Sequence, residues 1–160
     1  MSISSTEAIL RLGVGSGWLV ALLDTKAYPK HTPRCGKWLA FLPPETLDGD
    51  WQKLLAAFAA GLLGRQMKRL IERNDEGLYP TCIYTYDYDD ERDVSRIGYA
   101  LDGLRLHVPR LTYKSDAQTL SGEYSQPGKP LALYGLPAGG TIRDYRVRRR
   151  AKGGDSADGL

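Results

Sequence analysis

The stretch CIYTYDYDDERDVSR at residues 82–96 constrains the fold more strongly than any other part of the sequence. Its first half places a cysteine and three tyrosines at alternate positions, and these are Cys82, Tyr84, Tyr86 and Tyr88. Because strand side chains point alternately to opposite faces, this pattern predicts a central strand over residues 82–88. We expect its tyrosine face to line whatever the protein binds. The alternative is that the rings simply pack as a sheet face, for which tyrosine is well suited.

The residues after this strand predict an amphipathic helix. Asp89 or Asp90 can cap its N-terminus, and the acidic side chains of its first turn favour the helix dipole. Its apolar stripe consists of Val94, Ile97, Leu101 and Leu104. Gly98 lies inside the helix, where glycine costs about 1 kcal/mol relative to alanine. We therefore expect close packing at Gly98.

A second amphipathic helix is predicted to begin near Leu47. Its apolar residues recur at helical spacing and include Trp51, and Gly61 and Gly64 mark its C-terminal end. The apolar stripe should lie against a sheet, which makes Trp51 a predicted core residue.

Further strands are predicted at residues 18–24, 37–42 and 131–136, and residues 105–114 are predicted to form a connection that leads into a strand. The run at 18–24 is apolar at both parities, so we expect it to be covered on both faces. The charged segment at 65–77 fits either an exposed strand or a continuation of the preceding helix. We favour a strand over residues 66–71, which would place Lys68 and Arg69 on opposite faces.

The length and the charge distribution predict one domain with a basic tail. The chain has 160 residues, and we expect the domain to span residues 13–137 after a poorly ordered N-terminus at 1–12. Residues 143–152 carry six basic side chains and one acidic one, whereas the first 142 residues are electrically balanced. We therefore expect a basic, disordered tail at 138–160. Its segment Arg143–Lys152 either contacts RNA or an acidic partner, or only solubilises the protein.

Other features predict a cytoplasmic protein without a metal site or a cofactor. No apolar stretch is long enough to cross a bilayer, and the N-terminus MSISSTEAIL lacks the segments of a secretory signal. Cys35 and Cys82 are 47 positions apart in unrelated contexts. A metal site requires more ligands at closer spacing, so we expect two reduced thiols.

The loop TKAYPKHTPRCG at residues 25–36 is a candidate for the rim of a ligand site. Its two prolines and its glycine exclude regular structure over most of its length. Its donors and its aromatic ring belong to Lys26, Tyr28, Lys30, His31 and Arg34. The alternative is a solvated connection between two strands.

Four motifs together resemble a known family. They are GKW at 36–38, GLLG at 61–64, CIYTYD at 82–87, and YKSD at 113–116 with Gly122. They are similar to the basophilic-leukaemia-expressed family, which is often labelled a phosphothreonine lyase domain. The order and spacing also resemble the mRNA cap-binding initiation factor of the 4E type. The resemblance implies an α+β fold, in which helices pack on the convex face of a curved, mainly antiparallel sheet and the concave face holds a ligand groove.

The resemblance to the cap-binding family also implies positions for site residues. Tyr28 falls near the family's second cap-sandwiching tryptophan, and Tyr84 corresponds to the tryptophan beside the methyl group. The family's phosphate-binding lysine falls at Pro80, and its first sandwiching tryptophan has no counterpart. These departures argue against binding of the methylated cap itself.

The leading functional hypothesis is a binding module for a nucleotide, an RNA end or another phosphorylated ligand in the concave groove. Rings would stack on a base, at about 1–3 kcal/mol per base, and cations would hold phosphate. The candidate binding residues are Tyr28, His31, Arg34, Lys37, Lys68, Tyr84, Tyr86 and Lys114.

Two alternatives are an enzyme and an adaptor. A phosphothreonine lyase needs a base, for which Lys68 or Lys114 is a candidate, and an acid, for which His31 or His107 is a candidate. An adaptor would bind partner helices on the convex face, with an exposed Trp51 as its anchor.

Overall fold

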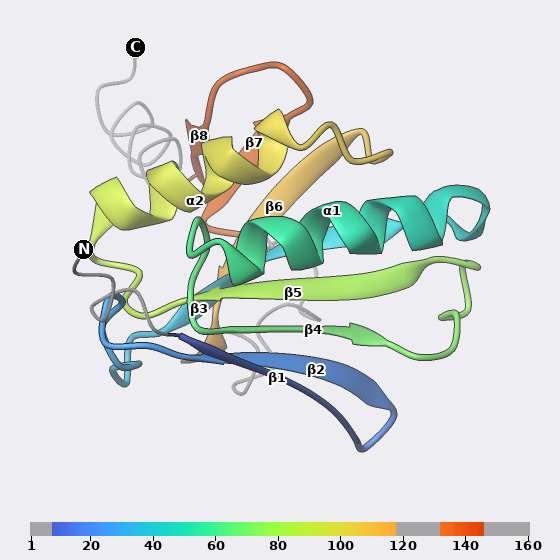
Figure 1. Cartoon of the computed structure of the whole chain (residues 1–160). Coiled ribbons are helices and arrows are strands. Elements are labelled where there is room, and N and C mark those ends of the chain that lie inside the picture. Colours follow the sequence, from blue (N-terminus) through green and yellow to red (C-terminus); the bar gives the residue numbers. More distant parts are fainter. Residues whose placement is uncertain (1–7, 118–131, 146–160) are drawn as a thin grey trace, which may run out of the picture.

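The computed structural model describes residues 8–117 and 132–145, which form one eight-stranded antiparallel sheet. The strand order is β1-β2-β4-β5-β3-β6-β7-β8. The strands are β1 (Ile9–Gly15), β2 (Trp18–Asp24), β3 (Gly36–Leu42), β4 (Gln66–Leu70), β5 (Tyr79–Thr85), β6 (Arg110–Ser115), β7 (Tyr134–Pro137) and β8 (Arg143–Asp144). Two helices, α1 (Leu47–Ala59) and α2 (Glu91–Gly103), lie on one face of this sheet (Figure 1). The structure thereby confirms the predicted α+β class, with a curved sheet and helices on its convex face.

The core lies between the helices and the convex face of the sheet. Trp38 of β3, Ile83 of β5 and Tyr113 of β6 are fully buried there. They form one row across the sheet, because β3 pairs with both β5 and β6. Trp51 of α1 is also buried, with 6% of its surface exposed. This confirms it as a core residue and removes the anchor that the adaptor hypothesis requires.

Helix α2 approaches the sheet most closely at its inner glycine. A Cβ atom added to Gly98 would lie 2.6 Å from Cζ2 of Trp38, so only glycine fits without a shift of the indole. Trp38 Nε1 also donates a hydrogen bond of 3.0 Å to the carbonyl oxygen of Val94 in the same helix. At the helix start, the Asp90 carboxylate accepts a hydrogen bond from the backbone N–H of Asp93 at 3.2 Å. The close packing and the Asp90 cap are therefore confirmed.

Strand β5 is a central strand, as predicted, but it ends at Thr85 rather than at residue 88. The Asp87 carboxylate accepts a hydrogen bond from the Asp89 N–H at 2.9 Å, and the Asp87 carbonyl accepts one from the Asp90 N–H at 3.1 Å. Aspartate turns of this kind compete with strand pairing. The prediction of one continuous tyrosine face is therefore wrong beyond Thr85.

The N-terminal hairpin corrects two further expectations. Residues 9–12 belong to the edge strand β1 and not to a poorly ordered segment. Ser16 and Gly17, with φ of 52° and 84°, form the two-residue turn that matches the twist of a hairpin. Strand β2 is covered on one face only, because both helices lie on that side: Ala21 is fully buried, whereas Leu22 is 43% exposed.

The remaining boundaries concern the charged segment and the tail. Strand β4 confirms a strand in the charged segment at 65–77. Arg143 and Asp144 form the short strand β8 rather than part of a disordered tail, and residues 146–160 lie outside the described part of the chain. Within that described part, none of the helices has the length and apolar character needed to span a membrane.

Candidate functional site

The strand register brings three of the predicted site residues into one row. Lys37 of β3 lies directly between Tyr84 of β5 and Lys114 of β6. The next residue along β3 is Trp38, which faces the helices. Because successive side chains of a strand point to opposite faces, the row lies on the concave face.

Side chains from β3, β4 and the loop at 25–36 lie around the ring of Tyr84. The Nζ atoms of Lys37 and Lys68 lie 5.6 Å and 6.0 Å from its centroid. The imidazole of His31 lies 6.0 Å from it, centroid to centroid, with the two planes tilted by 33°. Lys68 also lies over the indole of Trp18, at 4.2 Å from the ring centroid. Two ammonium groups therefore lie near one phenol at distances where cation–π attraction operates, the imidazole of His31 lies beside the same ring, and Trp18 joins the group through Lys68.

Asp116 supplies the negative charge that pairs with Lys37. Lys37 is only 9% exposed, and its Nζ lies 3.1 Å from Oδ1 of Asp116. A buried cation requires such a partner, because its removal from water is costly. The ammonium groups of Lys37, Lys68 and Lys114 thus lie on the same face as this carboxylate. The balance is positive, which suits an anionic ligand.

Burial shifts the acid–base behaviour of the other groups in the row. Desolvation, followed by the nearby charge of Lys37, lowers the pKa of Lys114. Partial burial also lowers the pKa of His31, so its imidazole is neutral at pH 7. Burial raises the pKa of Tyr84, whose hydroxyl therefore stays protonated and can donate a hydrogen bond.

Neither thiol near the row is poised to react. Burial, followed by a hydrogen bond from Sγ to Asp116 at 3.2 Å, raises the pKa of Cys35 to about 11. Burial raises the pKa of Cys82 to about 11 as well. The thiolate is the reactive form, and at neutral pH both groups are thiols. In the described ranges 8–117 and 132–145, there is no group of three or more side chains that could hold a metal ion.

Tyr28 and Tyr86 do not reach the concave row. Both pack against the core on the helical side, with ring centroids 5.5 Å apart in an edge-to-face arrangement. The Tyr28 hydroxyl donates to Asp93 and accepts from the backbone N–H of Tyr86 at 3.1 Å, and the Tyr86 hydroxyl donates to Asp90. The prediction that Tyr84 and Tyr86 share one face is therefore wrong, because the chain leaves the sheet at Thr85.

Arg34 is also held away from the row. Its Nε and Nη2 atoms donate to the two carboxylate oxygens of Asp87, at 3.1 Å and 2.6 Å, and its Nε lies 3.3 Å from Asp89. This bidentate pair lowers the pKa of Asp87. Arg34 thus ties the loop at 25–36 to the turn after β5.

Sequence reasoning missed Trp18 and Asp116 as members of the site. Trp18 reaches Lys68 only because β2 pairs with β4, and no local pattern gives that pairing. Asp116 could have been singled out, because it is the last residue of the YKSD motif. The motif alone, however, does not show that its carboxylate accepts hydrogen bonds from Lys37 and Cys35.

A cavity of about 520 Å³ adjoins the row. Leu39 and Phe41 of β3 have the same parity as Lys37 and line this cavity, and Lys114 joins the cavity to the row. Its other walls include Val108 and Pro109. Phe41 is 39% exposed. The concave face therefore changes from cationic to apolar along β3.

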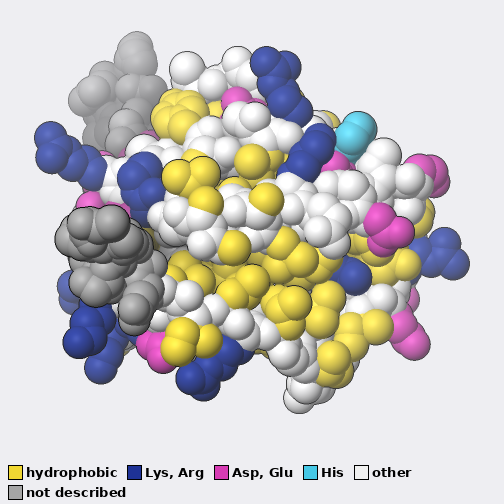
Figure 2. Space-filling model, viewed as in Figure 1, with side chains coloured by type: hydrophobic (Ala, Val, Ile, Leu, Met, Phe, Trp, Pro, Cys, Tyr) yellow, Lys and Arg dark blue, Asp and Glu magenta, His cyan; other side chains and the backbone are white. Residues whose placement is uncertain are grey.

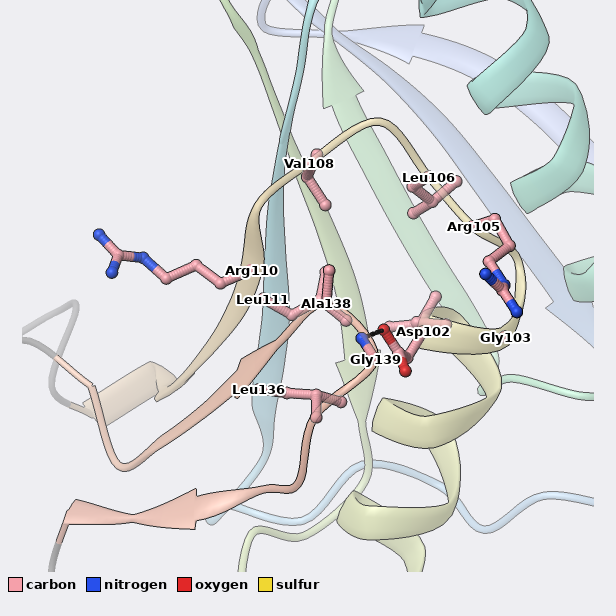
Figure 3. Close-up of a pocket in the computed structure, with 11 residues that line it drawn as sticks. Asp102, Gly103, Arg105, Leu106, Val108, Arg110, Leu111, Leu136, Ala138 and Gly139 are labelled. Carbon is pink, nitrogen blue, oxygen red and sulfur yellow. Dashed lines mark hydrogen bonds between the residues drawn. The ribbon is translucent and has the colours of Figure 1, made fainter.

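A second cavity, of about 370 Å³, lies between the end of α2 and strands β6 and β7 (Figure 3). It contains none of the predicted site residues. The Asp102 carboxylate in its wall accepts a hydrogen bond from the Gly139 N–H at 3.0 Å. The Arg110 side chain extends away from the other labelled residues in this view. These features make the row around Tyr84 the stronger candidate site.

A family model described as "Basophilic leukemia-expressed protein Bles03" matches residues 27–121, which is more than half of the chain. The chain belongs to the Bles03 family. The match contains most of the concave row, including His31, Lys37, Tyr84 and Asp116. No curated protein matches the chain by sequence.

Solved structures of eIF4E proteins share the fold. Eukaryotic eIF4E-3 of C. elegans, in a complex with the 4E-binding protein Mextli and cap analog, is 16% identical and has a TM-score of 0.52, over 68% of each chain. Schistosome eIF4E complexed with m7GpppA and 4E-BP is 15% identical and has a TM-score of 0.55, over 77% of this chain and 72% of that one. This Bles03-family chain therefore has an eIF4E-like fold.

Proposed function

We propose that this protein binds a phosphorylated ligand with a ring-bearing or apolar body, such as a nucleotide or an RNA end, on its concave face. The observation that carries the proposal is the position of Tyr84 between the ammonium groups of Lys37 and Lys68. A phosphate needs cations at the surface, and a nucleobase needs a ring on which to stack. The row provides both within one strand spacing.

The adjoining cavity supports a ligand with two unlike ends. From Lys37 to Phe41, β3 advances by four residues, which corresponds to about 13 Å. A phosphate near Lys37 and Lys114 would leave the rest of a nucleotide-sized ligand over Leu39 and Phe41. The cavity volume of about 520 Å³ lies within the usual range for small-molecule sites.

The similar structures support a nucleotide as the ligand class. Both eIF4E proteins were solved with a cap ligand, a cap analog in one and m7GpppA in the other. In this chain Tyr28, near the position of a cap-sandwiching tryptophan, packs in the core. A nucleotide without the methylated base is therefore the form that we expect to bind.

Isothermal titration calorimetry with the full chain tests this proposal. GTP, ATP, a cap dinucleotide, inorganic phosphate and the corresponding nucleosides should be titrated separately. A phosphorylated nucleoside should bind more tightly than either phosphate or nucleoside alone. The absence of heat and of thermal stabilisation with every one of these ligands would contradict the proposal.

Two lysine variants provide a matched comparison. Lys68→Gln removes one ammonium group from the row and should weaken nucleotide binding about tenfold, which corresponds to 1.4 kcal/mol. Lys53→Gln removes the same charge from α1, where Nζ contacts the carbonyl oxygen of Arg105 at 3.1 Å on the helical side. It should leave the affinity unchanged. Equal effects of the two substitutions would point to nonspecific charge attraction.

A second candidate function is β-elimination of phosphate from a phosphothreonine peptide. It is favoured by one observation, that Lys114, His107 and Arg110 line the same cavity. The lowered pKa of Lys114 suits a base that removes the α-proton, after which the Cβ–O bond breaks and phosphate leaves. His107 can protonate the departing phosphate, because its Nδ1 lies 2.8 Å from the buried Asp50 carboxylate, which orients the ring.

Mass spectrometry tests this reaction. A phosphothreonine peptide should be converted to the dehydrobutyrine peptide and free phosphate, and Lys114→Met should abolish the conversion. Unchanged peptide after prolonged incubation with folded protein would exclude it.

The basic segment 143–152 carries a separate proposal. We propose that it adds salt-sensitive contacts with RNA or another polyanion. A chain that lacks residues 146–160 should then bind RNA more weakly and with a smaller salt dependence, and an unchanged affinity would show that the segment only solubilises the protein.

A further inference from the structure

Strand β1 is an exposed edge of the sheet. It is the first strand in the order, and among the described residues it pairs with β2 alone. All seven of its residues are exposed. Its sequence, ILRLGVG, contains no proline, and its one charge, Arg11, lies 3.8 Å from Asp24. The opposite edge, β8, has only two residues.

Natural sheets protect their edges with short strands, proline or charge, because an open strand offers unpaired N–H and C=O groups to other chains. Strand β8 follows this rule by its length. Strand β1 is long and has no proline, and this contrast indicates that β1 pairs with a strand of another chain.

The side chains of β1 add an apolar surface beside the helices. Leu10 and Leu12 pair with Leu23 and Ala21 of β2, which are core residues under the helical layer. Leu10, Leu12 and Val14 therefore lie on the helical face, but they are 38%, 55% and 72% exposed. Figure 2 shows apolar side chains extending from the helical layer onto the strands below it. The sheet extends further than the helices that cover it.

We propose that β1 pairs antiparallel with β1 of a second copy of this chain. The seven residues are self-complementary when the pairing is centred on Leu12. In that register Leu12 lies opposite Leu12, and Leu10 lies opposite Val14. The two strands then form one row of six apolar side chains on the helical face, in which opposing pairs are mutually stabilising.

The other face of the paired strands also fits. Arg11 lies opposite Gly13, and Ile9 lies opposite Gly15, so no like charges lie directly opposite each other; the two Arg11 side chains are diagonal neighbours, and each lies close to its own Asp24. The glycines have open space around them, which leaves room for the longer side chains of the partner strand. A strand of another protein would need its own apolar and small residues at these positions, whereas a second copy of β1 supplies them by twofold symmetry.

This dimer does not obstruct the concave row. Strands β2 and β4 separate β1 from β5, so Tyr84 lies about 14 Å from the edge in the direction of strand pairing. The dimer is therefore independent of the proposed ligand site.

The test is the mass of the full chain by analytical ultracentrifugation over a range of concentrations. The wild-type protein should sediment as a dimer that dissociates on dilution. Leu12→Lys and Leu12→Glu each place like charges at the twofold axis, and each variant alone should be a monomer. An equal mixture of the two should restore a dimer, because lysine then faces glutamate.

Two controls keep the result specific. Leu62→Lys removes an apolar residue of similar exposure, 53%, that lies outside β1, and this variant should remain a dimer. Hydrogen exchange should show protection of the β1 amides in the wild type and its loss in Leu12→Lys, whereas the core strands stay protected in both. A wild-type monomer at every concentration, or a charge-variant mixture that stays monomeric, would overturn the proposal.

Discussion

The contact between Gly98 and Trp38 gives the most direct test of the packing described above. Gly98→Ala would place a Cβ atom 2.6 Å from Cζ2 and 2.9 Å from Cε2 of the Trp38 indole. The indole is fully buried and is held by the hydrogen bond from Nε1 to Val94. It cannot move aside without disturbing that bond or its packing against Tyr113.

Three opposing contributions determine how much Gly98→Ala changes the free energy of unfolding. Alanine in place of glycine gains about 1 kcal/mol of helix propensity. Overpacking of a close-packed core costs about 1–3 kcal/mol, and a weakened hydrogen bond costs about 0.5–1.5 kcal/mol. We therefore expect a net loss of about 2 kcal/mol, which lowers the Tm of a chain of this length by about 4–8 °C.

Urea unfolding followed by tryptophan fluorescence measures this loss. The midpoint should fall while the m-value stays the same, because the surface exposed on unfolding does not change. Gly103→Ala is the matched control. Gly103 is also in α2, but an added Cβ would meet nothing within 4 Å. This control should be at least as stable as the wild type.

One result would refute the reasoning. If Gly98→Ala were as stable as the wild type, the indole would have room that the structure does not show. The packing of α2 on β3 would then be looser than the distances imply.

Three further outcomes are expected. Arg34→Gln should lose stability at neutral pH, because Arg34 lowers the pKa of Asp87; that stabilisation is present above the unfolded aspartate pKa of about 3.9 and is lost as the pH falls through the lower folded value. The difference in urea midpoint from the wild type should accordingly be larger at pH 7 than at about pH 3, and equal differences would contradict the ion pair. Asp116→Asn should bring the pKa of Cys35 down from about 11, measured by the pH dependence of iodoacetamide labelling, because the carboxylate helps to raise it; an unchanged profile would show that burial acts alone. Nucleotide affinity should fall as the concentration of NaCl rises, because salt screens partly exposed ammonium groups such as that of Lys68, and a salt-independent affinity would exclude them as the phosphate contacts.

The local patterns of the sequence predicted most of the secondary structure. The stripe around Trp51 and the stripe around Val94 gave both helices, because a helix repeats its apolar contacts every three to four residues wherever it lies in a fold. The motif CIYTYD gave a central strand and, with GKW and YKSD, the family resemblance that the family match later showed. These patterns can be recognised in the sequence because each depends on residues that are close together along the chain.

Contacts between distant strands could not be predicted in the same way. Tyr84 and Tyr86 have the same parity, and only the Asp87 turn sends them to opposite sides of the sheet. Trp18 joins Lys68 because β2 pairs with β4 across 41 intervening residues. Arg34 looked like a phosphate ligand, yet in the fold its guanidinium is held by Asp87 and Asp89.

The sequence by itself thus determined both helices, most of the central strands and the family. The tertiary structure alone decided which side chains meet on the concave face. Five predicted site residues lie together there, and these are His31, Lys37, Lys68, Tyr84 and Lys114. Three others are held away from this face by different contacts, and these are Tyr28, Arg34 and Tyr86. The physical reason is that alternation places a side chain on one of two faces but does not say which strand lies beside it. Strand order and register are set by the burial of the whole core, and a one-residue change in either would give a different site.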